Sequence, residues 1–277
     1  MAKALSESDL SRFQRDGFLF PVPAIGAIEA AALYRRLADH EAEHGPLPQK
    51  MRQKVHLLFT GFADLVRNEA ILDAVEDVIG PDILVWGTSL FVKDAHDPAF
   101  VTWHQDSTYW GLSEPDVATA WVALSPSTRK SGCMKMIPGT QAWDQAPHRD
   151  TLAEHNLLTR GQEIAVEVDE SQAVYVELEP GEISIHNIRT VHGSEPNSSD
   201  DRRIGVSVRY IMPHVKQLFA ENDSAWLVRG EDRYGHFVAE TPPKADMDEA
   251  ALAEHDRVTA LRQGVLYRDV KGRPARL

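Results

Sequence analysis

The segment from residue 82 to residue 211 contains a series of short apolar runs with turn residues between them. The runs are rich in β-branched and aromatic side chains, which favour strands, and Pro126, Pro138-Gly139 and Pro180-Gly181 supply turns. Because no helical pattern separates most of the runs, they fit an antiparallel sandwich or jelly roll better than a parallel α/β sheet. We predict strands over residues 83–93, 101–106, 117–124, 133–137, 164–168, 183–186 and 204–211.

Helical patterns flank this β-rich segment on both sides. Before it, apolar residues recur at helical spacing over residues 6–15, 28–43 and 69–78. After it, Asp246 is a candidate cap for a helix with Glu249 at its third position. No repeat or low-complexity tract divides the chain. We therefore expect a single domain over residues 1–277, with a helical part at 1–80, a jelly-roll core at about 82–215 and a helical tail at about 220–277.

Composition narrows the classes of function. The chain has 29 Lys and Arg against 42 Asp and Glu, a net charge of −13, and its basic residues form no cluster. We therefore expect a small-molecule substrate and neither a nucleic-acid partner nor an anionic membrane surface. No run of about 18 apolar residues and no secretion signal occurs, so we expect a cytoplasmic location. The oligomeric state stays open. With Cys133 as the single cysteine, a bound metal must use His and carboxylate ligands.

The sequence His104-Gln105-Asp106 supplies two candidate metal ligands. On a strand, positions i and i+2 face the same side, so His104 and Asp106 can both point inward while Gln105 points away. One further imidazole would complete the two-His, one-carboxylate triad that binds Fe(II) and leaves coordination positions open. His192 is a candidate for it, because it closes a strand-like stretch and is followed by turn residues.

A polar loop after His192 leads into the predicted strand at 204–211. We expect this hairpin to set Arg203 on the strand beside His192, where its planar guanidinium group can bind a carboxylate. Asp106, Fe(II) and Arg203 together would carry two net positive charges. That charge balances a dicarboxylate such as 2-oxoglutarate.

These segments, with Ala120-Trp121-Val122-Ala123-Leu124 and Met136-Ile137-Pro138-Gly139-Thr140, resemble the phytanoyl-CoA dioxygenase family over roughly residues 10–235. Members of that family are Fe(II)- and 2-oxoglutarate-dependent oxygenases with a double-stranded β-helix fold. The resemblance implies a mainly β, cupin-like jelly-roll core buttressed by N-terminal helices. It implies the iron ligands His104, Asp106 and His192. It also implies 2-oxoglutarate contacts from Arg203, Ser194, Trp121 and Lys93.

The reaction implied by this resemblance is hydroxylation of an unactivated C–H bond, with O2 as co-substrate and decarboxylation of 2-oxoglutarate to succinate and CO2. Relatives that halogenate have a small Ala or Gly where Asp106 stands, so Asp106 favours hydroxylation. The negative net charge disfavours a phosphate-bearing acyl-CoA. We expect a small metabolite such as an amino acid, a compatible solute or an aminophosphonate, with acyl-CoA and natural-product hydroxylation as alternatives. Tyr109 and Trp110 are candidate substrate contacts at the barrel mouth.

Several alternatives stay open at this point. His186 lies six residues before His192 and would share its facing on an unbroken strand, so it could replace His192 as the third ligand. Arg202 could replace Arg203, because a bulge reverses strand parity. His40-Glu41-Ala42-Glu43-His44 also matches the HExxH motif of zinc peptidases, although Gly45-Pro46 follows it directly. A zinc-dependent hydrolase and a non-catalytic jelly-roll binding protein are therefore the alternative functions.

Overall fold

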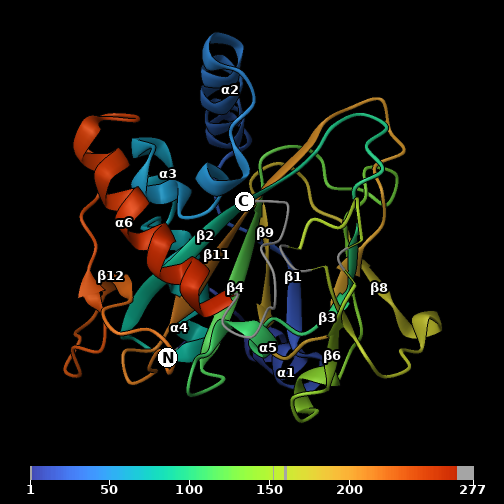
Figure 1. The fold of residues 1–277 in the computed structure, drawn as a ribbon. Coiled ribbons are helices and arrows are strands. Elements are labelled where there is room, and N and C mark those ends of the chain that lie inside the picture. The colour runs from blue at the N-terminus through green and yellow to red at the C-terminus, as the bar shows by residue number, and fades with distance from the viewer. Residues whose placement is uncertain (1, 152, 159–160, 267–277) are drawn as a thin grey trace.

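Two β-sheets face each other, and helices flank the larger one (Figure 1). The computed structural model describes residues 2–151, 153–158 and 161–266. The strands are β1 (Phe18–Pro23), β2 (Ile83–Lys93), β3 (Val101–His104), β4 (Val117–Ala123), β5 (Met134–Met136), β6 (His148–Asp150), β7 (Gln162–Ile164), β8 (Val174–Val176), β9 (Glu182–Asn187), β10 (His192–Ser194), β11 (Arg203–Ile211), β12 (Ser224–Arg229) and β13 (Val238–Ala239).

The large sheet has the strand order β1-β9-β4-β11-β2-β12-β13, and the small sheet has the order β3-β10-β5-β8. Strands β6 and β7 pair separately. All of these neighbours are antiparallel except β12 and β13. The structure thus confirms the predicted mainly β, jelly-roll class.

Helices cover the face of the large sheet that points away from the small sheet (Figure 1). Side chains of α3 and α4 pack there against the sheet in the main hydrophobic core, and α6 lies beside η2. The helices are α1 (Glu7–Asp16), α2 (Ala27–His44), α3 (Thr60–Leu65), α4 (Glu69–Ile79), α5 (Ser107–Trp110) and α6 (Glu249–Leu266), with 3-10 turns η1 (Gln49–Arg52), η2 (Val55–Leu57), η3 (Thr140–Ala142) and η4 (Glu170–Gln172).

Strand β11 shows how the sheet separates the core from the site. Ile204, Val206 and Val208 belong to the main core under the helices. The alternate residues Arg203 and Arg209 line a cavity between the two sheets. Because side chains alternate along a strand, one face of β11 packs in the core and the other faces the cavity.

Most of the predicted elements are confirmed. The helices expected at 6–15, 28–43 and 69–78 are α1, α2 and α4, and Ser6 caps α1 in a capping box with Asp9. The strand expected at 83–93 is β2. Among the described residues, no helix is long and apolar enough to span a membrane.

Three expectations about the flanking segments are corrected. The helical part at 1–80 also contains β1, which the prolines at 21 and 23 concealed; β1 is an edge strand, where proline is tolerated. The expected helical tail at 220–277 contributes β12 to the large sheet, and its residues 267–277 lie outside the described residues. Asp246 accepts hydrogen bonds from Thr60 at the start of α3, whereas Asp248 caps α6 by accepting from the Ala251 N–H.

Candidate active site

Three side chains converge between the sheets: those of His104 and Asp106 from one short motif, and that of His192 from β10. Each offers one ligand atom, and these atoms lie within 4.8 Å of one another. His104 ends β3 and stands opposite His192, the first residue of β10, with ring centroids 4.1 Å apart. Pairing within the small sheet therefore brings two imidazole groups to one point.

Asp106 reaches this point by a different local geometry from the one expected. Strand β3 ends at His104, and Asp106 is the N-cap of α5 with helical dihedral angles, φ −63° and ψ −35°. The strand predicted at 101–106 is therefore two residues too long. Gln105 does point away from the site, because its amide donates to the Arg189 carbonyl at 3.0 Å and accepts from the Ala146 N–H at 2.9 Å.

Backbone carbonyl groups orient both imidazole rings. His104 Nδ1 donates to the Thr102 carbonyl and His192 Nδ1 donates to the Thr190 carbonyl, each at 2.9 Å. The proton of each ring is thereby held on Nδ1, which leaves the Nε2 lone pair free for a metal ion. Two oriented imidazoles and one carboxylate are a donor set that fits Fe(II).

The protonation states also suit metal binding. Burial lowers the pKa of His192 to about 3, and repulsion from His104 acts in the same direction, so this imidazole is neutral at pH 7. Burial alone would raise the pKa of Asp106, but the imidazoles of His104 and His186 beside it outweigh burial and hold this pKa well below its usual range. Metal ligands must be deprotonated, and these two groups are.

His186 lies next to the triad but outside it. Its Nε2 atom is 3.7 Å from Asp106 Oδ2, and its ring centroid is 4.8 Å from that of His192. Neither of its ring nitrogens has a hydrogen-bond partner among the described residues. The set of three whose ligand atoms converge contains His192 and not His186. His186 therefore packs against the carboxylate of the triad.

Arg203 enters the cavity from the sheet opposite His192. The expected hairpin is wrong, because β11 pairs with β2 and β4 in the large sheet whereas β10 belongs to the small sheet. In a jelly roll, consecutive strands commonly cross from one sheet to the other, and the loop after Ser194 does so. Arg203 and His192 nevertheless line the same cavity.

Two buried basic side chains lie at this end of the cavity. Arg203 donates to the Gly132 carbonyl at 2.9 Å, lies 5.3 Å from the centroid of the Trp121 ring, and has its pKa lowered by burial to about 10. Lys93 stands opposite Arg203 on β2 and donates to Ser194 Oγ at 2.8 Å. Burial, and then repulsion from Arg203, lower the pKa of Lys93 to about 6. Arg203, Ser194 and Trp121 line the cavity, whereas Lys93, which donates to Ser194, is not part of the described lining.

The Arg202 side chain points away from the cavity. Its guanidinium group forms ion pairs with Glu41 at 2.6 Å and with Asp94 at 2.7 Å, and it is absent from the described cavity lining. The two adjacent arginines are therefore separated by strand alternation, with Arg203 inside.

Of the two candidate substrate contacts, one lines the cavity and the other does not. Trp110, at the end of α5, lines the cavity. Tyr109 is not part of the described lining, and its hydroxyl group donates to Asp150 at 3.0 Å.

Residues 13–205 match the model of the family described as "Phytanoyl-CoA dioxygenase (PhyH)". The chain belongs to the phytanoyl-CoA dioxygenase family. Members of this family are Fe(II)- and 2-oxoglutarate-dependent oxygenases, so the chain is an enzyme of that class.

Among curated proteins, this chain is similar to the "Probable alpha-ketoglutarate-dependent hypophosphite dioxygenase" of Stutzerimonas stutzeri, with 24% identity over 84% of this chain and 77% of that protein. It is also similar to the ectoine dioxygenase of Streptomyces avermitilis, with 26% identity over 49% of this chain and 52% of that protein. Of solved structures, the apo form of ThoJ, described as a non-heme monooxygenase, is 37% identical with a TM-score of 0.82, over 94% of this chain and 97% of that chain. A nickel complex of ThoJ is 34% identical with a TM-score of 0.77, over 94% of this chain and 99% of that chain.

The HExxH match on α2 forms no zinc site in this phytanoyl-CoA dioxygenase family member. The rings of His40 and His44 are close, with centroids 4.7 Å apart, but Glu41 is held by Arg202. Among the described residues, the one group of three metal-ligating side chains is His104, Asp106 and His192. The pair on α2 therefore lacks a third ligand.

Sequence reasoning missed a second polar part of the lining. It includes Gln53 after η1, Ser89 on β2 and Arg209 on β11. The alternation that separates Arg203 from Arg202 also predicts that Arg209 faces the cavity, six residues further along the same strand. Gln53 and Ser89 give no such signal, because only the folded chain brings them to Arg209.

Proposed function

We propose that this protein is a hydroxylase that uses Fe(II), 2-oxoglutarate and O2 to oxidise a C–H bond of a small molecule. The observation that carries the proposal is the convergence of His104, Asp106 and His192 in a cavity that also contains a buried guanidinium group. Bound Fe(II) would supply oxidation of the C–H bond by O2, coupled to decarboxylation of 2-oxoglutarate to succinate and CO2. The protein would hold the reactants in place and exclude water.

We assign the 2-oxoglutarate end of the cavity to Arg203, Ser194 and Trp121. Arg203 offers a fixed positive charge for the distal carboxylate, and its Nε atom has no hydrogen-bond partner among the described residues. Because Lys93 donates to Ser194 Oγ, the hydroxyl hydrogen of Ser194 is free to donate to the same carboxylate. Lys93 would thus act by orienting Ser194. The Trp121 ring would form the wall of this compartment.

Anaerobic titration with Fe(II) and 2-oxoglutarate tests the assignment. A chelated 2-oxo acid on Fe(II) gives a weak visible charge-transfer band, and we expect it in the wild type. Replacing His104 or Asp106 by Ala should abolish the band and turnover. His40→Ala is the matched control, because His40 lies on α2 outside the cavity. A band that persists in the His104 or Asp106 variants would refute the ligand assignment. Absence of a band in the wild type would instead favour a zinc hydrolase or a binding protein.

The substrate class is proposed on the names of the relatives and the charge of the chain. Relatives named for hypophosphite and ectoine act on small molecules, and the net charge of −13 disfavours acyl-CoA. We propose a small metabolite, with a natural-product intermediate as the alternative. The cytoplasmic location, the single domain and the lack of nucleic-acid or membrane partners stay predictions.

A further inference from the structure

His186 occupies the cavity face of β9. Along this strand, Ile183 and Ile185 belong to the main hydrophobic core, whereas the alternate residue His186 lines the cavity. Strands on both sides hold its backbone, since His186 is in register with Phe18 on β1 and with Thr119 on β4. The imidazole group therefore enters the cavity from a strand that is paired along both edges.

The His186 ring is buried without a hydrogen bond. The residue is 1% exposed, and neither ring nitrogen has a partner among the described residues. A buried polar group that lacks a partner costs about 1–3 kcal/mol, so its persistence in a native fold calls for an explanation. The Asp106 carboxylate, which lines the same cavity, is a charged acceptor beside the ring.

The two oxygen atoms of Asp106 face different imidazole groups. Oδ1 lies 3.4 Å from His104 Nε2, and Oδ2 lies 3.7 Å from His186 Nε2. His104 Nε2 is the nitrogen available to a metal ion, because Nδ1 donates to the Thr102 carbonyl. Oδ1 is therefore on the metal side of the carboxylate, and Oδ2 is on the side of His186.

A modest rotation of the carboxylate is enough to form a hydrogen bond between Asp106 and His186. The separation of 3.7 Å is about 0.5 Å longer than the upper limit for an N–H···O bond. The last torsion of an Asp side chain has a broad minimum, so Oδ2 can cover this distance at little cost. With its proton on Nε2, the His186 ring is the donor. Carboxylates that bind metal ions are commonly fixed by such hydrogen bonds from neighbouring groups.

We propose that His186 is a positioning residue for Asp106: it donates from Nε2 to Oδ2 and so directs Oδ1 toward the metal ion. This inference rests on the proposed function, because it concerns the carboxylate ligand of the same Fe(II) site. Backbone carbonyl groups orient the two imidazole ligands, His104 and His192. His186 orients the third ligand.

Anaerobic titration with Fe(II) tests the proposal on the full chain after its metal has been removed, in competition with a coloured Fe(II) chelator. His186→Phe and His186→Leu remove the donor and keep an apolar side chain in its place. Loss of a group that orients a metal ligand typically costs about 10-fold to 100-fold in metal affinity, and we expect a loss of this size in both variants. His186→Gln should retain most of the Fe(II) affinity, because its amide group is a donor on a side chain of similar length.

Thr119→Val is the matched control. Thr119 is in register with His186, is 1% exposed, and has no hydrogen-bond partner for Oγ1 among the described residues, but it is not part of the described cavity lining. This substitution removes a buried polar atom from the same face of the sheet and keeps the His186 donor. We expect unchanged Fe(II) affinity. Urea denaturation of each metal-free variant measures whether it is folded.

Three results would overturn the proposal. The first is Fe(II) affinity in His186→Phe and His186→Leu equal to or above that of the wild type. The second is His186→Gln binding Fe(II) no more tightly than His186→Leu, which would assign the effect to packing of the ring. The third is an equal loss of Fe(II) affinity in Thr119→Val.

The charge-transfer band at saturating Fe(II) and 2-oxoglutarate keeps these results separate from the proposed function. If the wild type forms no band, the proposed function fails. If the wild type forms the band and the His186 variants bind Fe(II) as tightly as it does, only the positioning role of His186 fails.

Discussion

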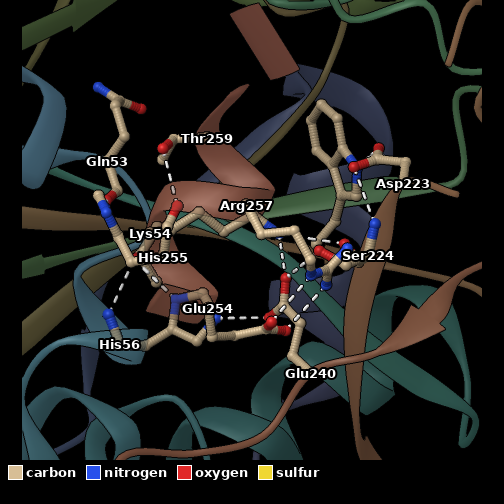
Figure 2. Close-up of polar contacts among 12 residues, drawn as sticks. Gln53, Lys54, His56, Asp223, Ser224, Glu240, Glu254, His255, Arg257 and Thr259 are labelled. Carbon is tan, nitrogen blue, oxygen red and sulfur yellow. Dashed lines mark hydrogen bonds and ion pairs between the residues drawn. The ribbon is translucent and has the colours of Figure 1, made fainter. Parts of the chain in front are cut away.

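Two buried groups of charged side chains in this protein differ in how their charge is balanced. The first is the cavity, with three guanidinium groups and one carboxylate in its described lining. The second, which we call the Glu240 cluster, comprises Lys54, His56, Ser224 and Glu240 (Figure 2). In the Glu240 cluster, one carboxylate oxygen accepts from Lys54 and from Ser224 Oγ at 2.8 Å, and the other lies 2.8 Å from His56 Nε2.

The difference separates a structural cluster from a binding site. The Glu240 carboxylate and the Lys54 ammonium group neutralise each other, and their side chains are 0% and 1% exposed. Such a cluster is complete and ties residues 54–56 to β12 and residue 240. In the cavity, the Arg203 guanidinium group donates to the backbone carbonyl of Gly132, and an anionic ligand can balance its charge.

The largest expected effect on stability is in the Glu240 cluster. Glu240→Gln leaves the Lys54 ammonium group buried without a counter-charge, and breaking a buried pair in this way costs about 3–5 kcal/mol of unfolding free energy. Urea denaturation measures it. Glu231→Gln is the control, because Glu231 is exposed and contacts Arg233 at the surface, and we expect a change within about 0.5 kcal/mol. Equal losses of unfolding free energy in Glu240→Gln and Glu231→Gln would contradict a structural role for the Glu240 cluster.

Arg203→Met should weaken 2-oxoglutarate binding and leave the free energy of unfolding almost unchanged, the reverse of what we expect for Glu240→Gln. We expect 2-oxoglutarate affinity to fall roughly 10-fold to 150-fold, the equivalent of about 1.5–3 kcal/mol for hydrogen bonds to a charged group. Stability should change by less than about 1 kcal/mol, because the Gly132 carbonyl keeps a donor in Lys93. Titration of the charge-transfer band and urea denaturation measure the two effects. A large loss of stability with unchanged 2-oxoglutarate affinity would show that Arg203 stabilises the fold and does not bind this ligand.

The pH dependence of stability should also identify Glu240 as a structural group. Burial alone would raise the pKa of Glu240, but Lys54 and His56 outweigh burial and lower it from 4.5 to about 2. A carboxyl group with a lowered pKa stabilises the fold above its unfolded pKa and loses this contribution as the pH falls toward its folded pKa. We therefore expect stability to decrease between about pH 4.5 and pH 2. Glu240→Gln should have a shallower decrease over this range, measured by urea denaturation at each pH. Parallel curves would contradict the assignment.

The smallest expected effect concerns the reactivity of the Cys133 thiol. Cys133 lies near Arg203 and Lys93, which would favour its thiolate, but burial dominates and raises the pKa of the thiol to about 12. Its side chain is buried in the native state. We expect a disulfide reagent to modify Cys133 only after unfolding in guanidinium chloride. Rapid modification of the native protein would show that the positive end of the cavity activates the thiol.

The sequence predicts the parts of the site that depend on local pattern. His104, Asp106 and His192 follow from a short motif and the family resemblance. Arg203 follows from that resemblance, because the hairpin expected to place it is wrong. The turn that orients Asp106 was not predictable from the period of the strand. Residues that meet only through long-range pairing were also missed, such as Gln53 with Ser89, and Lys54 with Glu240, which are separated by 36 and 186 positions in the chain.

The Trp121 ring rests directly on the backbone at Gly205. A Cβ atom at position 205 would lie 1.9 Å from the ring, so even alanine would displace the indole. Trp121 lines the cavity beside Arg203, so the absent side chain at position 205 keeps this part of the cavity wall in place. A single methyl group on the neighbouring strand would therefore change the shape of the cavity.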